Sequence, residues 1–127
     1  MVAVEEVEDV LEPLIVHKWF ATWDVKQQYV QYAYSLGGLD FVALIECENW
    51  NWNPFIKSKT NDHGICQLNY WYNAKFIESE DFKDVYKQLD YCYAKYQVNP
   101  NLWYWPKRMI KGQRCSTYVL NRFVINA

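Results

Sequence analysis

Apolar and polar positions follow a helical period along most of the 127-residue chain. The clearest stretch is residues 81–97, where apolar side chains recur at intervals of three and four, as on one face of a helix: Phe82, Val85, Tyr86, Leu89 and Tyr93. Residues 4–20, 24–36 and 114–125 are further helical candidates. The pattern therefore predicts a mostly helical domain.

Gly37 and Gly38 are a stop signal for the helix predicted over 24–36. Asp40 follows directly and has a side chain suited to N-cap a new helix that begins at Phe41. We expect two consecutive helices, separated at the glycine pair.

Residues 51–69 interrupt the helical pattern. They contain Asn-Pro, Thr-Asn-Asp and a glycine, which favour turns, and the best candidate strand is GICQL at residues 64–68. No repeat, low-complexity tract or linker divides the chain, and a chain of this size supports one core. The expected fold class is α+β, mostly helical, with a small β element around residues 51–69.

Composition narrows the class of protein. Aromatic residues make up 19% of the chain, including seven tryptophans, which is high for a soluble domain. The net charge of −2 argues against a nucleic-acid partner, which usually requires a basic excess. Residues 107–122 carry five basic side chains and no acidic one, while residues 5–12 are acidic. Two solvated helix faces, or an anionic polymer along the basic segment, are both consistent with this asymmetry.

Targeting and metal-binding signals are weak. No apolar run approaches the roughly 20 residues of a membrane helix, and the acidic N-terminus is unlike a signal peptide. The four cysteines show no Cys-x-x-Cys spacing, so we expect no zinc site and no cofactor. Two disulfides and four buried thiols stay open; if disulfides form, Cys92 and Cys115 are candidates to link the C-terminal helices.

The helix that begins at Phe41 ends with two glutamates. Phe41, Leu44, Ile45 and Glu48 fall on one stripe, which should face the core, whereas Glu46 points elsewhere. A carboxyl group on an apolar stripe either finds a cationic partner or has its pKa raised by desolvation. A raised pKa is the property that a general acid needs.

The segment ALIECENWNWNPFIKSKTNDHGICQL, residues 43–68, resembles the signature of the lysozyme-like superfamily, in particular the soluble lytic transglycosylases. Their pattern is E-S-x-F-N-P-x-A-x-S-x-x-G-A-x-G-L-M-Q-I. Counted from Pro54, the offsets of Ser58, Gly64 and Gln67 all match. The apolar lead-in places Glu48 at the catalytic position, with one extra residue before Pro54 and with Asn49 in place of the usual serine.

A second resemblance overlaps the first. NDHGICQLNYWYN, residues 61–73, is similar to the strand sequence D-Y-G-I-L-Q-I-N-S-R-W-W of the animal c-type lysozymes, with Asp62 at their second carboxylate and Asn69 at their strand asparagine. STYVLNRFV is similar to the C-terminal helix of the transglycosylases and would bring Tyr118 toward the site. Their Ala-Tyr-Asn-Ala-Gly motif is absent.

These resemblances imply a single, monomeric lysozyme-like domain over residues 1–127, with N-terminal helices in 1–39 and a catalytic core in 40–127. They imply a lytic transglycosylase that acts on the β-1,4 bond between N-acetylmuramic acid and N-acetylglucosamine in peptidoglycan and leaves 1,6-anhydro ends. Such an enzyme would tolerate Asp62→Asn. The alternatives are a hydrolytic lysozyme that uses Asp62 as second carboxylate, and a non-catalytic sugar-binding or structural virion protein.

The same resemblances assign roles to individual residues. Glu48 and Asp62 are the candidate catalytic residues, and the candidate substrate-binding residues are Ser58, Gln67, Asn69, Trp52, Trp71 and Tyr118. A protein of this kind would act on glycan strands at the cell wall, whether periplasmic, extracellular or carried by a phage virion.

Overall fold

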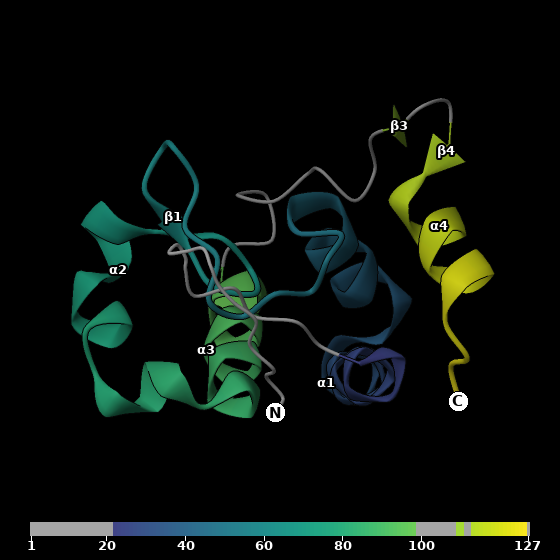
Figure 1. The fold of residues 1–127 in the computed structure, drawn as a ribbon, viewed down its shortest axis with the longest axis horizontal. Helices are drawn as coiled ribbons and strands as arrows, with labels where there is room; N and C mark the ends of the chain where they lie inside the picture. The colour runs from purple at the N-terminus through teal and green to yellow at the C-terminus, as the bar shows by residue number, and fades with distance from the viewer. Residues whose placement is uncertain (1–21, 99–108, 111–112, 127) are drawn as a thin grey trace.

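The computed structural model describes residues 22–98, 109–110 and 113–126 of the chain (Figure 1). The first element, α1 (Trp23–Glu48), begins after Thr22, whose side chain accepts a hydrogen bond from the backbone N–H of Val25. It contains a kink at Gly38, where φ is 69° and ψ is −165°. The predicted break between two helices is thus confirmed at Gly38. The helix predicted over 4–20 lies outside the described residues.

The β element is a small antiparallel hairpin. Strand β1 (Asp62–His63) pairs with β2 (Leu68–Asn69), with Asp62 opposite Asn69. On the other side of β1, Lys57 forms a bridge with His63. The prediction that GICQL forms a strand is wrong, because Gly64 and Gln67 have φ values of 83° and 56° and residues 64–67 form the turn between the strands.

The chain continues as α2 (Tyr70–Ile77), the 3-10 helix η2 (Glu80–Lys83) and α3 (Val85–Val98). The single helix predicted over 81–97 is split at Asp84, whose side chain accepts a hydrogen bond from the backbone N–H of Tyr86 at 2.9 Å and so begins α3. Helix α2 was not predicted. The chain ends in β3 (Met109–Ile110), β4 (Gln113–Arg114) and α4 (Cys115–Arg122), shorter than the helix predicted over 114–125.

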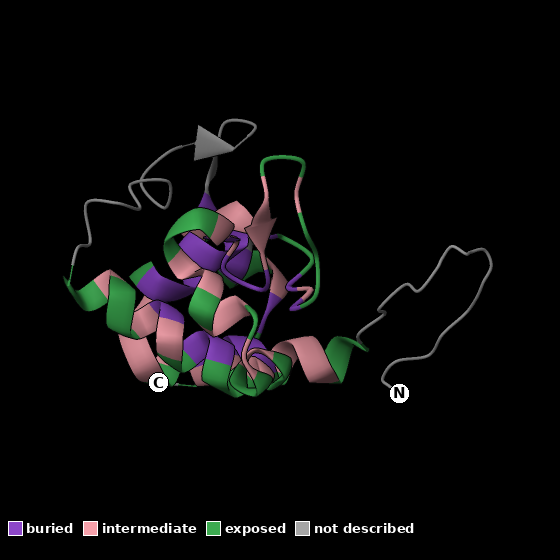
Figure 2. Ribbon diagram, turned by 90° about the vertical axis from the view of Figure 1, so that its left-hand side faces the viewer, coloured by how far each residue is buried: buried purple, intermediate pink, exposed green. Residues whose placement is uncertain are grey.

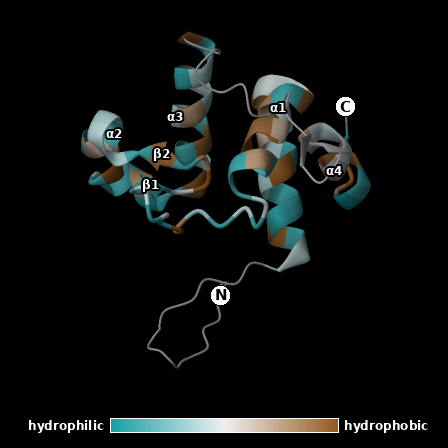
Figure 3. Cartoon of the chain, turned by 90° about the horizontal axis from the view of Figure 1, so that it is seen from above, coloured by the Kyte–Doolittle hydropathy of each residue, from teal (hydrophilic) through white to brown (hydrophobic). Residues whose placement is uncertain are grey.

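Helix α3 lies between two groups of elements (Figure 1, Figure 3). On one side are the β1–β2 hairpin and α2, and on the other are α1 and α4, which pack against each other. In the second half of α1, residues 41–46 are all buried, so this stretch is covered on all sides (Figure 2). Each neighbouring segment contributes buried residues to the core around it, among them Trp52, Ile65, Leu89 and Val119.

One disulfide joins α1 to α4 and the other joins the hairpin to α3, so that all four cysteines of the chain are paired. Cys47 of α1 is bonded to Cys115 of α4, with Cα atoms 5.6 Å apart, and Cys66 of the hairpin turn is bonded to Cys92 of α3, with Cα atoms 6.5 Å apart. The predicted pairing of Cys92 with Cys115 is wrong, because α4 packs on α1 rather than on α3.

The predicted α+β class, mostly helical with a small β element, is confirmed. Within the described ranges, no helix is both long and apolar enough to cross a membrane.

Candidate functional site

Glu48 is the last residue of α1 and is half-buried. Burial and, to a smaller extent, the negative charge of Asp62 raise the pKa of Glu48 to about 7. The C-terminal end of a helix also disfavours a carboxylate, and the last turn of α1 contains no basic residue. No hydrogen bond from another described residue offsets these effects. Glu48 is therefore suited to hold and release a proton near neutral pH.

Asp62 lies on β1 in polar surroundings. The Thr60 hydroxyl donates a hydrogen bond of 2.6 Å to one of its carboxylate oxygens, and the Asn69 amide donates one of 3.3 Å to the other. The Ser58 hydroxyl lies 3.3 Å from the same oxygen as Thr60 and accepts a hydrogen bond of 3.1 Å from the Asp62 backbone N–H. Both oxygens of the Asp62 carboxylate therefore accept hydrogen bonds from neighbouring side chains.

The hairpin thus brings together four residues that the sequence identified: Ser58, Asp62 and Asn69 lie in one hydrogen-bonded cluster, and Glu48 is close enough for its pKa to respond to Asp62. One carboxyl group is desolvated and the other is hydrogen-bonded. Two neighbouring carboxyl groups in such different environments can divide the work of an acid and of a charged carboxylate.

Glu46 does not face solvent. It is 2% exposed, accepts a hydrogen bond of 2.8 Å from the Trp52 indole N–H and forms an ion pair with Arg122 of α4. Burial raises the pKa of Glu46, while the contacts with Trp52 and Arg122 oppose that rise. Glu46 lies on a different side of α1 from Glu48, as expected. That side is buried as well, because Trp52 and α4 cover it.

Trp52 was predicted to bind substrate, and this prediction is wrong. Its side chain is fully buried, because it packs edge-on against Phe123 while its N–H reaches Glu46. Its backbone has a φ of 55°, in the left-handed region, within the turn between Glu48 and Pro54. Trp52 is a core residue that connects this turn to α1 and α4.

The two candidate sugar-binding amides make hydrogen bonds to backbone groups in and next to the hairpin. Gln67 donates to the carbonyl oxygens of Gly64 at 2.9 Å and Ile56 at 3.4 Å. The Asn69 side-chain oxygen accepts a hydrogen bond of 3.0 Å from the backbone N–H of Trp71 and N-caps α2. In this structure both amides shape the hairpin that carries Asp62.

Exposed aromatic rings lie at the start of α2 and just after the end of α1. Trp71 and Tyr72, in the first turn of α2, are 76% and 85% exposed, and Trp50, two residues after Glu48, is 63% exposed. Of the predicted substrate-binding aromatics, Trp71 therefore has a free surface. Tyr118 lies in α4, but its side chain is outside the described part of the structure.

Several residues of this region could not be recognised as part of the site from the sequence. Arg122, Asn49 and Thr60 carried no recognisable signal of their contacts. Gln88 did carry one, because it is the polar member of the apolar stripe on the helix that contains Val85 and Leu89. In the structure Gln88 is fully buried.

Comparisons of this chain with protein-family models, with curated proteins and with solved structures gave no match. In the described ranges, no group of three or more histidine, cysteine, aspartate or glutamate side chains is arranged to hold a metal ion. The chemical interpretation of the site consequently depends on the geometry around Glu48 and Asp62.

Proposed function

We propose that this protein is a peptidoglycan-cleaving glycosidase with a lysozyme-like fold. The observation that carries the proposal is the pair formed by Glu48, whose pKa is raised to about 7, and the hydrogen-bonded Asp62 beside it. Cleavage of a glycosidic bond requires a carboxylic acid that stays protonated near neutral pH, because the leaving oxygen must gain a proton as positive charge develops on the anomeric carbon.

In the first step, Glu48 gives its proton to the oxygen of the β-1,4 bond between N-acetylmuramic acid and N-acetylglucosamine. The bond between that oxygen and the anomeric carbon breaks, and the N-acetylglucosamine side leaves as an alcohol. With a pKa of about 7, Glu48 is about half protonated at neutral pH. No cofactor takes part in this step.

The second step has two routes. In hydrolysis, Asp62 stabilises or attacks the anomeric carbon, and water then adds there while its proton passes to Glu48. In transglycosylation, the 6-hydroxyl of the muramic acid adds instead, its proton passes to Glu48, and Asp62 is not needed. The spacing from Pro54 to Gln67 favours transglycosylation. The hydrogen bonds from Thr60 and Asn69 that hold the Asp62 carboxylate near Glu48 favour hydrolysis, and we propose hydrolysis as the main route.

A glycan strand is the proposed partner. Trp71 and Tyr72 at the start of α2 follow β2 directly and offer aromatic faces on which sugar rings can stack. The two disulfides support a place of action outside the cytoplasm, at the cell wall, because such bonds persist in oxidising compartments.

The test is digestion of purified peptidoglycan by the oxidised protein, followed by mass spectrometry of the soluble muropeptides. Hydrolysis gives reducing ends, and transglycosylation gives 1,6-anhydro ends that weigh one water less. We expect reducing ends. Anhydro products would keep the glycosidase assignment and reverse the choice of route.

A non-catalytic sugar-binding or structural role is favoured by one observation, the extra residue in the turn between Glu48 and Pro54. In that case the protein would bind sedimented peptidoglycan and release no muropeptides at any pH between about 5 and 7, where the acid form of Glu48 is available. That result would overturn the glycosidase proposal.

A further inference from the structure

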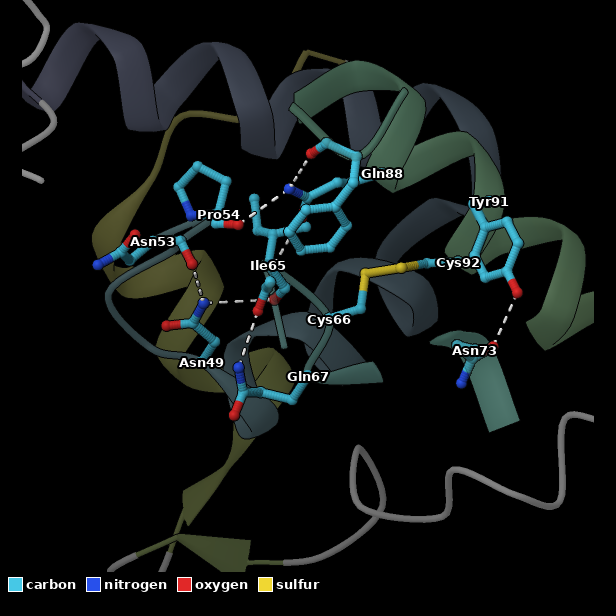
Figure 4. Close-up of a disulfide and its surroundings, with 12 residues drawn as sticks. Asn49, Asn53, Pro54, Ile65, Cys66, Gln67, Asn73, Gln88, Tyr91 and Cys92 are labelled. Atoms are coloured by element: carbon cyan, nitrogen blue, oxygen red, sulfur yellow. Dashed lines mark hydrogen bonds between the residues drawn. A yellow bond between two sulfur atoms is a disulfide. The ribbon is translucent and has the colours of Figure 1, made fainter. Parts of the chain in front are cut away.

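Asn49 connects the end of α1 to the hairpin turn (Figure 4). It is the residue after Glu48 and is only 6% exposed. Its side-chain N–H₂ group donates one hydrogen bond to the carbonyl oxygen of Asn53 at 2.8 Å and another to that of Ile65 at 3.4 Å. Ile65 belongs to the turn between β1 and β2, so the residue next to Glu48 contacts the turn of the hairpin that carries Asp62.

Gln88 reaches the same turn from α3 (Figure 4). Its side-chain oxygen accepts a hydrogen bond of 2.9 Å from the backbone N–H of Ile65. Its N–H₂ group donates to the carbonyl oxygens of Pro54 at 2.9 Å and Phe82 at 2.7 Å. Because one end faces a donor and the other faces two acceptors, the orientation of the buried amide is fixed.

The turn approaches Gln88 too closely for a side chain at Gly64. A Cβ atom there would lie 2.6 Å from the Gln88 side-chain oxygen, and φ at Gly64 is 83°. One helical turn further along α3, Cys92 is bonded to Cys66 of the same turn. The turn is therefore attached to α3 at two points, by an amide and by a disulfide.

From these contacts we infer that Asn49 and Gln88 form a buried amide clamp on Ile65 that sets the position of Asp62 relative to Glu48. Both backbone groups of Ile65 are held, the N–H by Gln88 and the carbonyl by Asn49. They are positioning residues, since neither is placed to take part in the bond cleavage itself. The expected effect on rate depends on the glycosidase function proposed above, whereas the effect on geometry does not.

The physical reason is that satisfied buried amides specify one arrangement of the segments that they join. An apolar side chain at either position would fill space and leave the peptide groups of Ile65 without partners, so the turn would move to find new ones. A displacement of about 1 Å in a catalytic group can lower a rate by up to about 100-fold. The hairpin carries Asp62 only two residues before Gly64, so the displacement would reach it.

The decisive variant is Gln88→Met, which is neutral, similar in length and unable to make the three hydrogen bonds. The probe is the carboxyl carbon of Glu48, titrated by NMR in the oxidised full chain. We expect the pKa of the Glu48 carboxyl group to lie about one pH unit below the wild-type value. The charge of Asp62 would move away from Glu48, and water would enter beside the carboxyl group. On peptidoglycan, we expect kcat to fall about 10-fold while KM changes less than about two-fold.

Leu89→Ala is the matched control, since Leu89 is the next residue of α3, is equally buried and makes no contact in the clamp. Leu89→Ala should lower the melting temperature of the protein. It should leave unchanged both the pKa of Glu48 and the pH at which the rate of peptidoglycan cleavage declines on the alkaline side. Asn49→Ser is the milder second variant, because it keeps a donor that is too short to reach both carbonyls. It should move the Glu48 pKa in the same direction as Gln88→Met and still give a folded protein.

An unchanged Glu48 titration in Asn49→Ser and Gln88→Met would overturn the clamp, as would an equal shift in Leu89→Ala. If Gln88→Met does not fold, the Glu48 titration in Asn49→Ser alone tests the clamp. If the wild-type protein cleaves no peptidoglycan, the proposed function fails, but the NMR titration still tests whether the clamp positions Asp62.

Discussion

The last turn of α1 carries two glutamates on two differently built sides of the helix. On the α4 side, Glu46 is buried and paired, with Trp52 and Arg122 both in contact with its carboxylate. On the hairpin side, Glu48 is half-buried, and its main electrostatic neighbour is Asp62, which has the same charge. The two residues are chemically identical and only two positions apart.

The difference separates a carboxylate with a partner from one without. The desolvation of Glu46 is partly offset by Trp52 and Arg122, which connect α1 to α4. Ionisation of Glu48 is opposed by both desolvation and the like charge of Asp62. Groups that are unfavourable for stability and set in a specific environment are candidates for chemistry.

The largest effect is expected from Glu48→Gln. Removal of the proton donor should lower peptidoglycan cleavage by about 10²–10⁴-fold. The same change should raise the free energy of unfolding at pH 8 by about 1–3 kcal/mol, because it removes a disfavoured charge that is partly screened by solvent. Turbidity of peptidoglycan suspensions and urea unfolding measure the two effects. An active Glu48→Gln would show that the acid lies elsewhere.

Asp62→Asn comes next, and the proposed hydrolytic route predicts a loss of activity where the transglycosylase resemblance predicts tolerance. If Asp62 stabilises or attacks the anomeric carbon, the rate should fall by about 10²-fold or more. Loss of its charge should also lower the pKa of Glu48 and move the alkaline limb of the rate profile below about 7. Rate measurements across pH test both effects. A variant that keeps most of its activity and yields anhydro products would identify a transglycosylase.

Glu46→Gln is expected to act on stability. It leaves the charge of Arg122, a side chain that is 25% exposed, without its partner, and should lower the free energy of unfolding by about 2–4 kcal/mol. The folded fraction should keep its cleavage activity, in contrast to Glu48→Gln. Adding Arg122→Met should recover part of the loss in a double-mutant cycle. Equal activity losses in the two glutamine variants would remove the distinction between the two sides of α1.

The smallest effect is the pH dependence of wild-type stability. The ordinary carboxyl value is 4.5 in the unfolded chain and about 7 for folded Glu48, so the folded state holds the proton more tightly. The contribution of Glu48 to stability is therefore full below pH 4.5 and is lost as pH rises through about 7, by about 1–3 kcal/mol. Urea unfolding of the wild-type protein and of Glu48→Gln at several pH values isolates the contribution of Glu48 to stability, because the variant lacks this carboxyl group.

Local signals predicted part of the fold and of the site. The kink at Gly38 followed from a glycine pair, and the raised pKa of Glu48 followed from its place on an apolar stripe. Helix α2 was missed because its sequence begins with aromatic residues and asparagine, which are poor helix formers, and because its N-cap, Asn69, also serves the hairpin. A strand was expected where Gly64 and Gln67 adopt positive φ values, which composition alone did not reveal.

Contacts between residues far apart in the chain could not be predicted from the sequence. The burial of Glu46 depends on Arg122, which lies 76 positions away, and the Cys47–Cys115 bond spans 68 positions. Trp52 was assigned to substrate because tryptophan suits both sugar stacking and a core, and only the position of α4 decides between the two. Helical periodicity identifies the side of a helix that is apolar, but it does not show that a second side is covered as well.

The two disulfides are nested, since the loop closed by Cys66 and Cys92 lies entirely inside the loop closed by Cys47 and Cys115. A single cut in the backbone anywhere between Cys47 and Cys115 would leave the two pieces covalently joined. An endopeptidase that nicks this protein once within the outer loop therefore releases no fragment until a reductant is added. Gel electrophoresis would show one band before reduction and two bands after it.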